Sequence, residues 1–113
     1  MQKASDIIKS LPQRFKPERA EDGMESVFHF DISGDEGGEF TVELKDGNCT
    51  VSEGLHGTAN CVVKAKDEVY SEIELGKRNP QMAIFMGQLK ISNLGEMMRF
   101  IGLFERLYKK DKH

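Results

Sequence analysis

The fold is decided by residues 79–104, NPQMAIFMGQLKISNLGEMMRFIGLF, where the spacing of the apolar side chains changes twice. Residues 80–87 carry apolar side chains at helical spacing, after an asparagine and at a proline that are typical of a helix start. Residues 88–92 alternate polar and apolar side chains, which predicts a half-buried strand. The helical period returns after Asn93, so we expect a last helix over about residues 94–109.

The expected last helix carries more apolar surface than packing on one neighbour requires. One face holds five large apolar residues: Leu94, Met97, Met98, Ile101 and Phe104. A second stripe beside it holds three more: Phe100, Leu103 and Leu107. Packing against a single neighbour needs an apolar arc of only about 100°. We therefore expect this helix to contact two apolar partners, one being the sheet and the other being a second helix, another subunit or a bound lipid.

The residues before this stretch predict a sheet flanked by short helices. Four segments have the composition and alternation of strands: 25–33, 39–45, 48–53 and 59–66. Short loops join them, one being the hairpin signal Asp46-Gly47, so we expect an antiparallel meander with one solvated face. Helices are expected over residues 3–11 and from Asp67, the predicted cap, to Gly76.

Composition limits the class of protein. The chain has 113 residues, so we expect a single domain over residues 1–113. Its formal net charge is −3 and no basic stripe stands out, which argues against a nucleic-acid partner. No run approaches the ~18 apolar residues of a membrane span, and the first residues do not resemble a secretory signal, so we expect a cytoplasmic location. We expect Cys49 and Cys61 to be small buried residues and not a disulfide.

Reactive residues show no arrangement that is typical of catalysis. His29, His56 and His113 have no second ligand at a spacing used for metals. The chain has no Gly-x-Ser-x-Gly elbow and no Walker loop. Residues 34–38 hold three glycines but join two expected strands, whereas a phosphate cradle needs a following helix. We therefore expect no catalytic residues, no metal, no cofactor and no enzymatic activity.

The segment Gly76-Lys77-Arg78-Asn79-Pro80-Gln81, followed by Ala83, Phe85, Gly87 and Leu89-Lys90-Ile91, carries a specific resemblance. It resembles the sterol carrier protein 2 family, also called nonspecific lipid-transfer proteins, and the likeness extends over about residues 5–107. The chain departs from the usual pattern of the family at Ile84, Gln88 and Ser92-Asn93, which leaves the fold expectation intact.

The resemblance implies an α/β (α+β) domain. Its five-stranded, mixed but mostly antiparallel sheet would be covered by helices on one face, with an apolar tunnel between the layers. Such a tunnel takes fatty acids, fatty acyl-CoA, phospholipids or sterol-like molecules, and the domain has no catalytic machinery of its own. We expect thirteen residues to contact lipid: Phe28, Phe30, Val42, Leu44, Gln81, Met82, Phe85, Met86, Leu89, Met97, Met98, Ile101 and Phe104.

Two alternatives stay open at this point. In the first, the chain is an interaction module that forms a homodimer through the last helix, with Phe100, Leu103 and Leu107 at the contact and a vestigial cavity. In the second, it is an accessory domain of a lipid-metabolising enzyme. If the chain is a lipid carrier, we expect transient contact with a membrane. The basic residues near the C-terminus are one candidate for this contact: Arg106, Lys109, Lys110 and Lys112.

Overall fold

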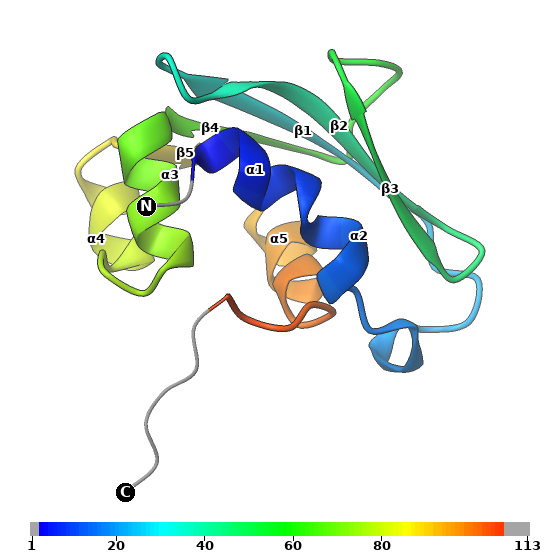
Figure 1. The fold of residues 1–113 in the computed structure, drawn as a ribbon. Helices are drawn as coiled ribbons and strands as arrows, with labels where there is room; N and C mark the ends of the chain where they lie inside the picture. Colours follow the sequence, from blue (N-terminus) through cyan, green and yellow to red (C-terminus); the bar gives the residue numbers. More distant parts are fainter. Residues whose placement is uncertain (1–2, 108–113) are drawn as a thin grey trace, which may run out of the picture.

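The computed structural model describes residues 3–107 and has two layers, a sheet and a set of short helices on one face of it (Figure 1). The five strands are β1 Ser26–Ser33, β2 Gly38–Lys45, β3 Asn48–Glu53, β4 Cys61–Lys66 and β5 Leu89–Ile91. The helical elements are α1 Ala4–Lys9, α2 Leu11–Arg14, the 3-10 helix η1 Pro17–Arg19, α3 Asp67–Glu74, α4 Pro80–Phe85 and α5 Leu94–Ile101. The α+β architecture is the one expected from the sequence.

The sheet has the strand order β3-β2-β1-β4-β5 and is mixed, as the resemblance implies. β1 runs antiparallel to β2, with Phe28 opposite Val42, and parallel to β4, with Phe28 opposite Cys61. The expected meander is therefore correct for the first three strands and wrong for the fourth. The loop after β3 leads β4 across to the free edge of β1, and the Asn60 amide donates to the Val27 carbonyl at 2.7 Å to begin the new pairing.

The hairpin turn at Asp46-Gly47 and the helix start at Asn79 are confirmed, and the cap predicted at Asp67 is wrong. Asp46 and Gly47 both adopt positive φ, 54° and 74°, as a two-residue hairpin of the primed type requires. The Asn79 side chain caps α4 by accepting from two backbone N–H groups. Asp67 was expected to cap α3, but Lys66 occupies that position. The Asp67 carboxylate instead accepts from the Glu36 amide at 2.9 Å, and this bond ties α3 to the loop that follows β1.

The last helix is shorter than expected. α5 ends at Ile101, Gly102 closes it, and the chain then turns so that Phe104 forms a β-bridge with Phe15. The Lys16 amide donates to the Leu103 carbonyl at 2.8 Å, and this bond holds the turn in place. The apolar period continues past residue 101, but the side chains after it are buried by a bend and not by further helix. Residues 108–113, which include the end of the expected helix and most of the basic tail, lie outside the described part.

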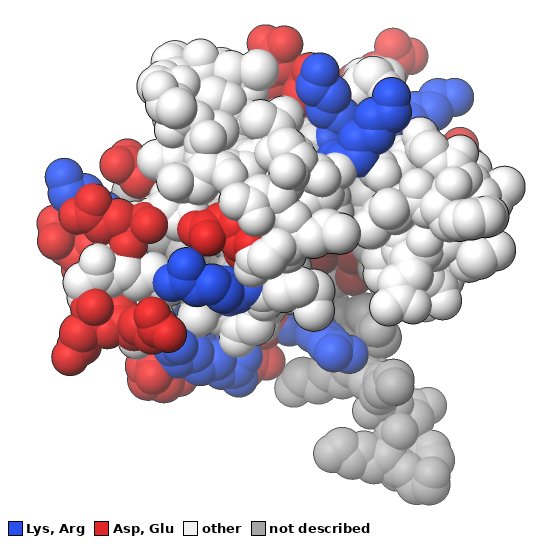
Figure 2. All heavy atoms as spheres, turned by 180° about the vertical axis from the view of Figure 1, so that it is seen from behind, with Lys and Arg blue, Asp and Glu red and all other residues white. Residues whose placement is uncertain are grey.

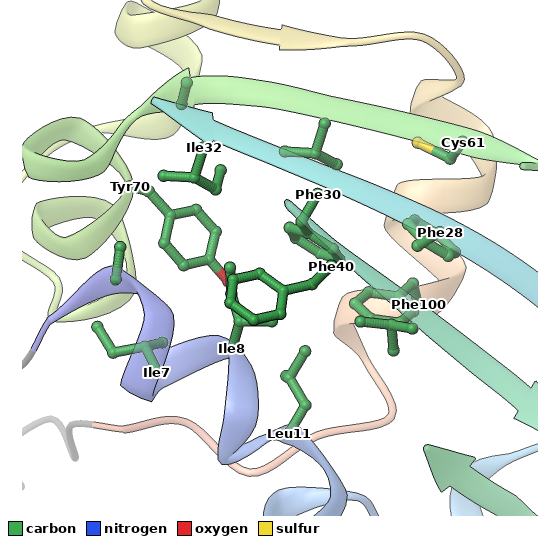
Figure 3. Packing of buried hydrophobic residues seen from close by; sticks show 14 of the residues in the cluster. Ile7, Ile8, Leu11, Phe28, Phe30, Ile32, Phe40, Cys61, Tyr70 and Phe100 are labelled. Atoms are coloured by element: carbon green, nitrogen blue, oxygen red, sulfur yellow. The ribbon is translucent and has the colours of Figure 1, made fainter. Parts of the chain in front are cut away.

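Aromatic rings fill the centre of the space between the layers (Figure 3). The Phe100 ring of α5 stacks on the Phe28 ring of β1 with centroids 4.1 Å apart. Tyr70 of α3 meets Phe30 edge-on at 5.9 Å, and Phe104 packs on Phe100 at 4.7 Å. This packing does not show the apolar tunnel that the resemblance implies between the layers.

α5 faces the core with the stripe that we expected to be its second one. Phe100 and Leu103 are only 3% and 6% exposed, together with Phe104 from the first stripe. Leu94, Met98 and Ile101 of the first stripe point to solvent and are each more than half exposed. The Phe100 ring stacks on the Phe28 ring of β1, and this contact turns Met98 and Ile101 away from the sheet. Phe100 and Leu103, which the homodimer alternative places at its contact, are therefore already buried in the core of one chain, and a homodimer through the last helix stays a prediction.

The two cysteines are free thiols, as expected. Cys61 on β4 is fully buried, and Cys49 on β3 is half-buried. Burial raises the pKa of the Cys49 thiol to about 12, although the charge of Arg14 opposes the rise. Cys49 therefore stays protonated near neutral pH and is a poor nucleophile in the folded protein.

Replacing Phe100 by alanine should lower the free energy of unfolding by about 3–5 kcal/mol, because the change removes a buried ring and leaves a cavity. The neighbouring exposed position is the control, and Ile101→Ala should change the free energy by about 0.5 kcal/mol or less. Urea unfolding followed by circular dichroism measures both. Equal losses in the two variants would contradict the orientation of α5 described above.

Candidate functional site

The residues that we expected to contact lipid fall into two settings. Seven are part of the core or packed against it: Phe28, Phe30, Val42, Leu44, Leu89, Phe104 and the half-buried Met97. Six are exposed: Gln81, Met82, Phe85, Met86, Met98 and Ile101. α4 faces the core through Ala83. Met82, Phe85 and Met86 therefore point outwards, whereas we had expected them to face the space between the helices and the sheet. Figure 2 shows mostly uncharged surface on the side of the molecule that carries α4 and α5.

A groove of about 830 Å³ lies among the helices, on the side of the helical layer away from the sheet centre. Its apolar lining is drawn from α2, α3, the start of α4, α5 and the bend after α5: Leu11, Ile73, Pro80, Met98, Phe100, Ile101, Gly102 and Phe104. Its polar lining consists of Arg14, Arg19, Glu74, Glu105 and Arg106. The volume falls in the range of about 300–1,000 Å³ that is typical of small-molecule sites.

The bend after α5 forms one wall of the groove, and the end of α2 holds it there. The Phe15 and Phe104 rings pack with centroids 5.5 Å apart. Backbone hydrogen bonds flank this contact, one from the Glu105 amide to the Arg14 carbonyl at 2.8 Å. The groove therefore depends on a contact between segments that lie about ninety residues apart in the sequence.

Arg14 is the charged group at the centre of this wall. Its guanidinium donates to the Glu105 carbonyl at 3.0 Å, to the Ser10 hydroxyl at 3.0 Å and to the Ile7 carbonyl at 3.3 Å. These bonds use three of the five N–H donors that a guanidinium has. Arg19 lies nearby and pairs with the Glu105 carboxylate at 3.3 Å.

α3 contributes a part-buried hydrogen bond to the groove. The Tyr70 hydroxyl donates to the Glu74 carboxylate at 2.7 Å, and Glu74 lines the groove. Burial raises the pKa of Tyr70 well above its ordinary value; the negative charge of Glu74 and the bond to it add to the rise, while Arg14 opposes it. Tyr70 is therefore a neutral donor that fixes the position of the Glu74 carboxylate.

Three of the residues expected from the sequence to contact lipid line this groove: Met98, Ile101 and Phe104. The residues that line it from the N-terminal segments were not predicted. Leu11 ends the helix expected over residues 3–11, but nothing in the sequence placed it beside α5. Arg14 and Arg19 lie in no motif, and only their contact with the bend after α5 reveals them. Exposed Met82, Phe85 and Met86 do not line the groove.

Comparison with known proteins identifies the class. The sequence pattern of the SCP-2 sterol transfer family matches residues 7–105, and the chain belongs to this family. Sterol carrier protein 2 of Gallus gallus is 36% identical over 81 residues, which are 68% of this chain and 15% of that protein. The chain thus spans less than a fifth of the length of this curated relative. Family membership gives the chain a lipid-binding or lipid-transfer role in general.

Solved structures share the fold. The crystal structure of sterol carrier protein 2 like 2 from Aedes aegypti has a TM-score of 0.67 and 19% identity, and covers 87% of this chain and 92% of that one. The solution structure of its palmitated form has a TM-score of 0.62 at 15% identity, with 93% and 96% covered. The sec-alkylsulfatase Pisa1 from Pseudomonas sp. has a TM-score of 0.76 at 20% identity, covering 96% of this chain and 17% of the sulfatase. At these identities the likeness shows the fold alone.

Tyr70 gives the groove a measurable signature at high pH. Its folded pKa is raised, so the folded protein keeps a proton that the unfolded chain releases. The resulting stabilisation is complete below about pH 10 and is lost as the pH rises further. The other tyrosine is Tyr108, and a Tyr108→Phe variant isolates the signal of Tyr70. We expect its phenolate absorbance to appear only well above pH 10, together with unfolding; ionisation near pH 10 in the folded protein would contradict the part-buried bond to Glu74.

Proposed function

We propose that the chain binds the apolar part of a lipid in the groove between α2, α3 and α5, and carries or presents it. The observation that supports this proposal is the groove itself, whose floor is made of core side chains such as Phe100 while Met98 and Ile101 stand exposed at its mouth. A lipid chain lying there would cover both exposed side chains. The ligand class is a fatty acid, fatty acyl-CoA, phospholipid or sterol-like molecule.

The energy of apolar burial is sufficient for this role. Each methylene removed from water contributes ~0.8 kcal/mol, so ten methylenes give roughly 8 kcal/mol before the cost of association. Methionine adapts its shape to different apolar partners, and Met98 at the mouth of the groove is suited to ligands of differing shape. The palmitated relative from Aedes aegypti, which has the same fold, supports an acyl chain as the occupant.

The charged lining favours a ligand with an anionic end. Arg14, Arg19 and Arg106 line the groove against two carboxylates, Glu74 and Glu105. Arg14 keeps two N–H donors beyond the three that its hydrogen bonds use. A guanidinium pairs well with a carboxylate or a phosphate. Among the candidates, a fatty acid or phospholipid therefore fits better than a sterol.

Two tryptophan substitutions test the groove, because Met98 and Met86 are matched in exposure at 64% and 63% and only Met98 lines it. Met98→Trp should weaken binding of a fluorescent fatty acid by about tenfold or more, ~1.4 kcal/mol, by filling the mouth. Met86→Trp should leave the affinity unchanged.

The thirteen residues expected from the sequence to contact lipid include both Met86 and Met98, so that set predicts weaker fatty-acid binding in both variants. The two substitutions therefore also distinguish binding in the groove from binding by the earlier set of residues. Wild-type affinity in both variants would contradict the proposal. Thermal unfolding of each variant provides the control for folding.

A second candidate role is presentation of a lipid to an enzyme. It is supported by the long relatives, since a domain of this fold occupies 17% of the sulfatase chain. The same groove would serve in both roles, and only a carrier has to move lipid unaided between vesicles. No helix in residues 3–107 is long and apolar enough to cross a membrane. The cytoplasmic location and the lack of enzymatic activity stay predictions.

A further inference from the structure

The outer face of α4 is apolar and serves neither the core nor the groove. Met82, Phe85 and Met86 follow one another at i, i+3 and i+4, so they share a face of the helix. They are 55%, 85% and 63% exposed, while Ala83 of the same helix is buried. Single exposed apolar residues are ordinary, but three on one helical turn form a patch that is typical of a contact surface.

Three lysines lie beside this apolar face. Lys64 on β4 stands directly opposite Lys90 on β5, and Lys66 ends β4. All three line one surface hollow of about 500 Å³ together with Gly87 and Gln88, the residues that directly follow the apolar turn of α4. Figure 2 shows Lys and Arg side chains gathered next to the uncharged surface, at the place where β4 and β5 lie.

Positive charge is in excess at this hollow. None of the three lysines forms a salt bridge within the described residues. Asp31 is the one carboxylate among the lining residues and lies opposite Lys64 in the pairing of β1 with β4, so one carboxylate stands against three lysines. Like charges placed directly opposite on neighbouring strands, as Lys64 and Lys90 are, destabilise a sheet. An external anion beside the hollow would remove this repulsion.

We propose that the α4 face, Met82, Phe85 and Met86 with Lys64, Lys66 and Lys90, docks on the surface of an anionic lipid bilayer. The three apolar side chains would enter the interface between headgroups and acyl chains, and the lysines would contact the headgroup phosphates. A second copy of the chain fits less well, because it would cover the three apolar side chains but would not by itself supply an anionic partner for the three lysines. The start of α4 lines the groove through Pro80, so the inference extends the proposed function but does not depend on it.

Co-sedimentation with vesicles tests the docking face on the whole chain. The vesicles are phosphatidylcholine alone and phosphatidylcholine with phosphatidylglycerol, each at low and high salt. The wild type should bind the anionic vesicles and should lose this binding at high salt. Phe85→Ser should weaken the binding by about tenfold, because the most exposed apolar side chain is lost. Leu55→Ser, at an exposed leucine in the loop after β3, is the control and should bind as the wild type does.

The double variant Lys64→Gln, Lys90→Gln tests the charge separately. It should bind anionic vesicles about 25-fold more weakly, at about fivefold per lysine. Neither lysine lines the groove, so this variant should bind fluorescent fatty acid normally, and failure of the docking face is thus distinguishable from failure of the groove. Wild-type vesicle binding in both the Phe85 and lysine variants would overturn the proposal. So would a dimer, seen by light scattering, that Phe85→Ser dissociates.

Discussion

The stacking of Phe100 on Phe28 is the contact on which the rest of the structure depends. It places the aromatic side of α5 against the central strand of the sheet and so decides which residues of α5 remain outside. Met98 and Ile101 reach the groove because Phe100 occupies the core in their place. Without this stacking, the same helix could turn its methionines towards the sheet, and the groove among the helices would lose one wall.

Elements whose signals are local were predictable from the sequence. Alternation along β1 and β2 gave the correct inward residues, and Asp46-Gly47 and Asn79-Pro80 fixed a turn and a helix start. The inward face of α5 was not predictable, because the helix has two adjacent apolar stripes and periodicity does not rank them. The place of β4 was also missed, since a short loop permits either a hairpin or a crossing to the far edge of β1.

The candidate site was harder to predict than the fold, for a physical reason. Its walls come from segments near both ends of the chain, joined by the bridge between Phe15 and Phe104. Periodicity describes which residues share a face of one element, and it contains no information on which elements meet. Arg14 has no motif around it, and its position in the groove follows from hydrogen bonds to Ile7 and Glu105 that form only in the folded chain.

The bridge between Phe15 and Phe104 also sets an order of events during synthesis. The N-terminal wall of the groove leaves the ribosome early, whereas its counterpart follows only when the chain has emerged through residue 106. Until then Leu11 and the aromatic core residues lack their cover. A growing chain therefore has no completed groove until residue 106 has emerged, and it leaves apolar side chains exposed to water up to that point.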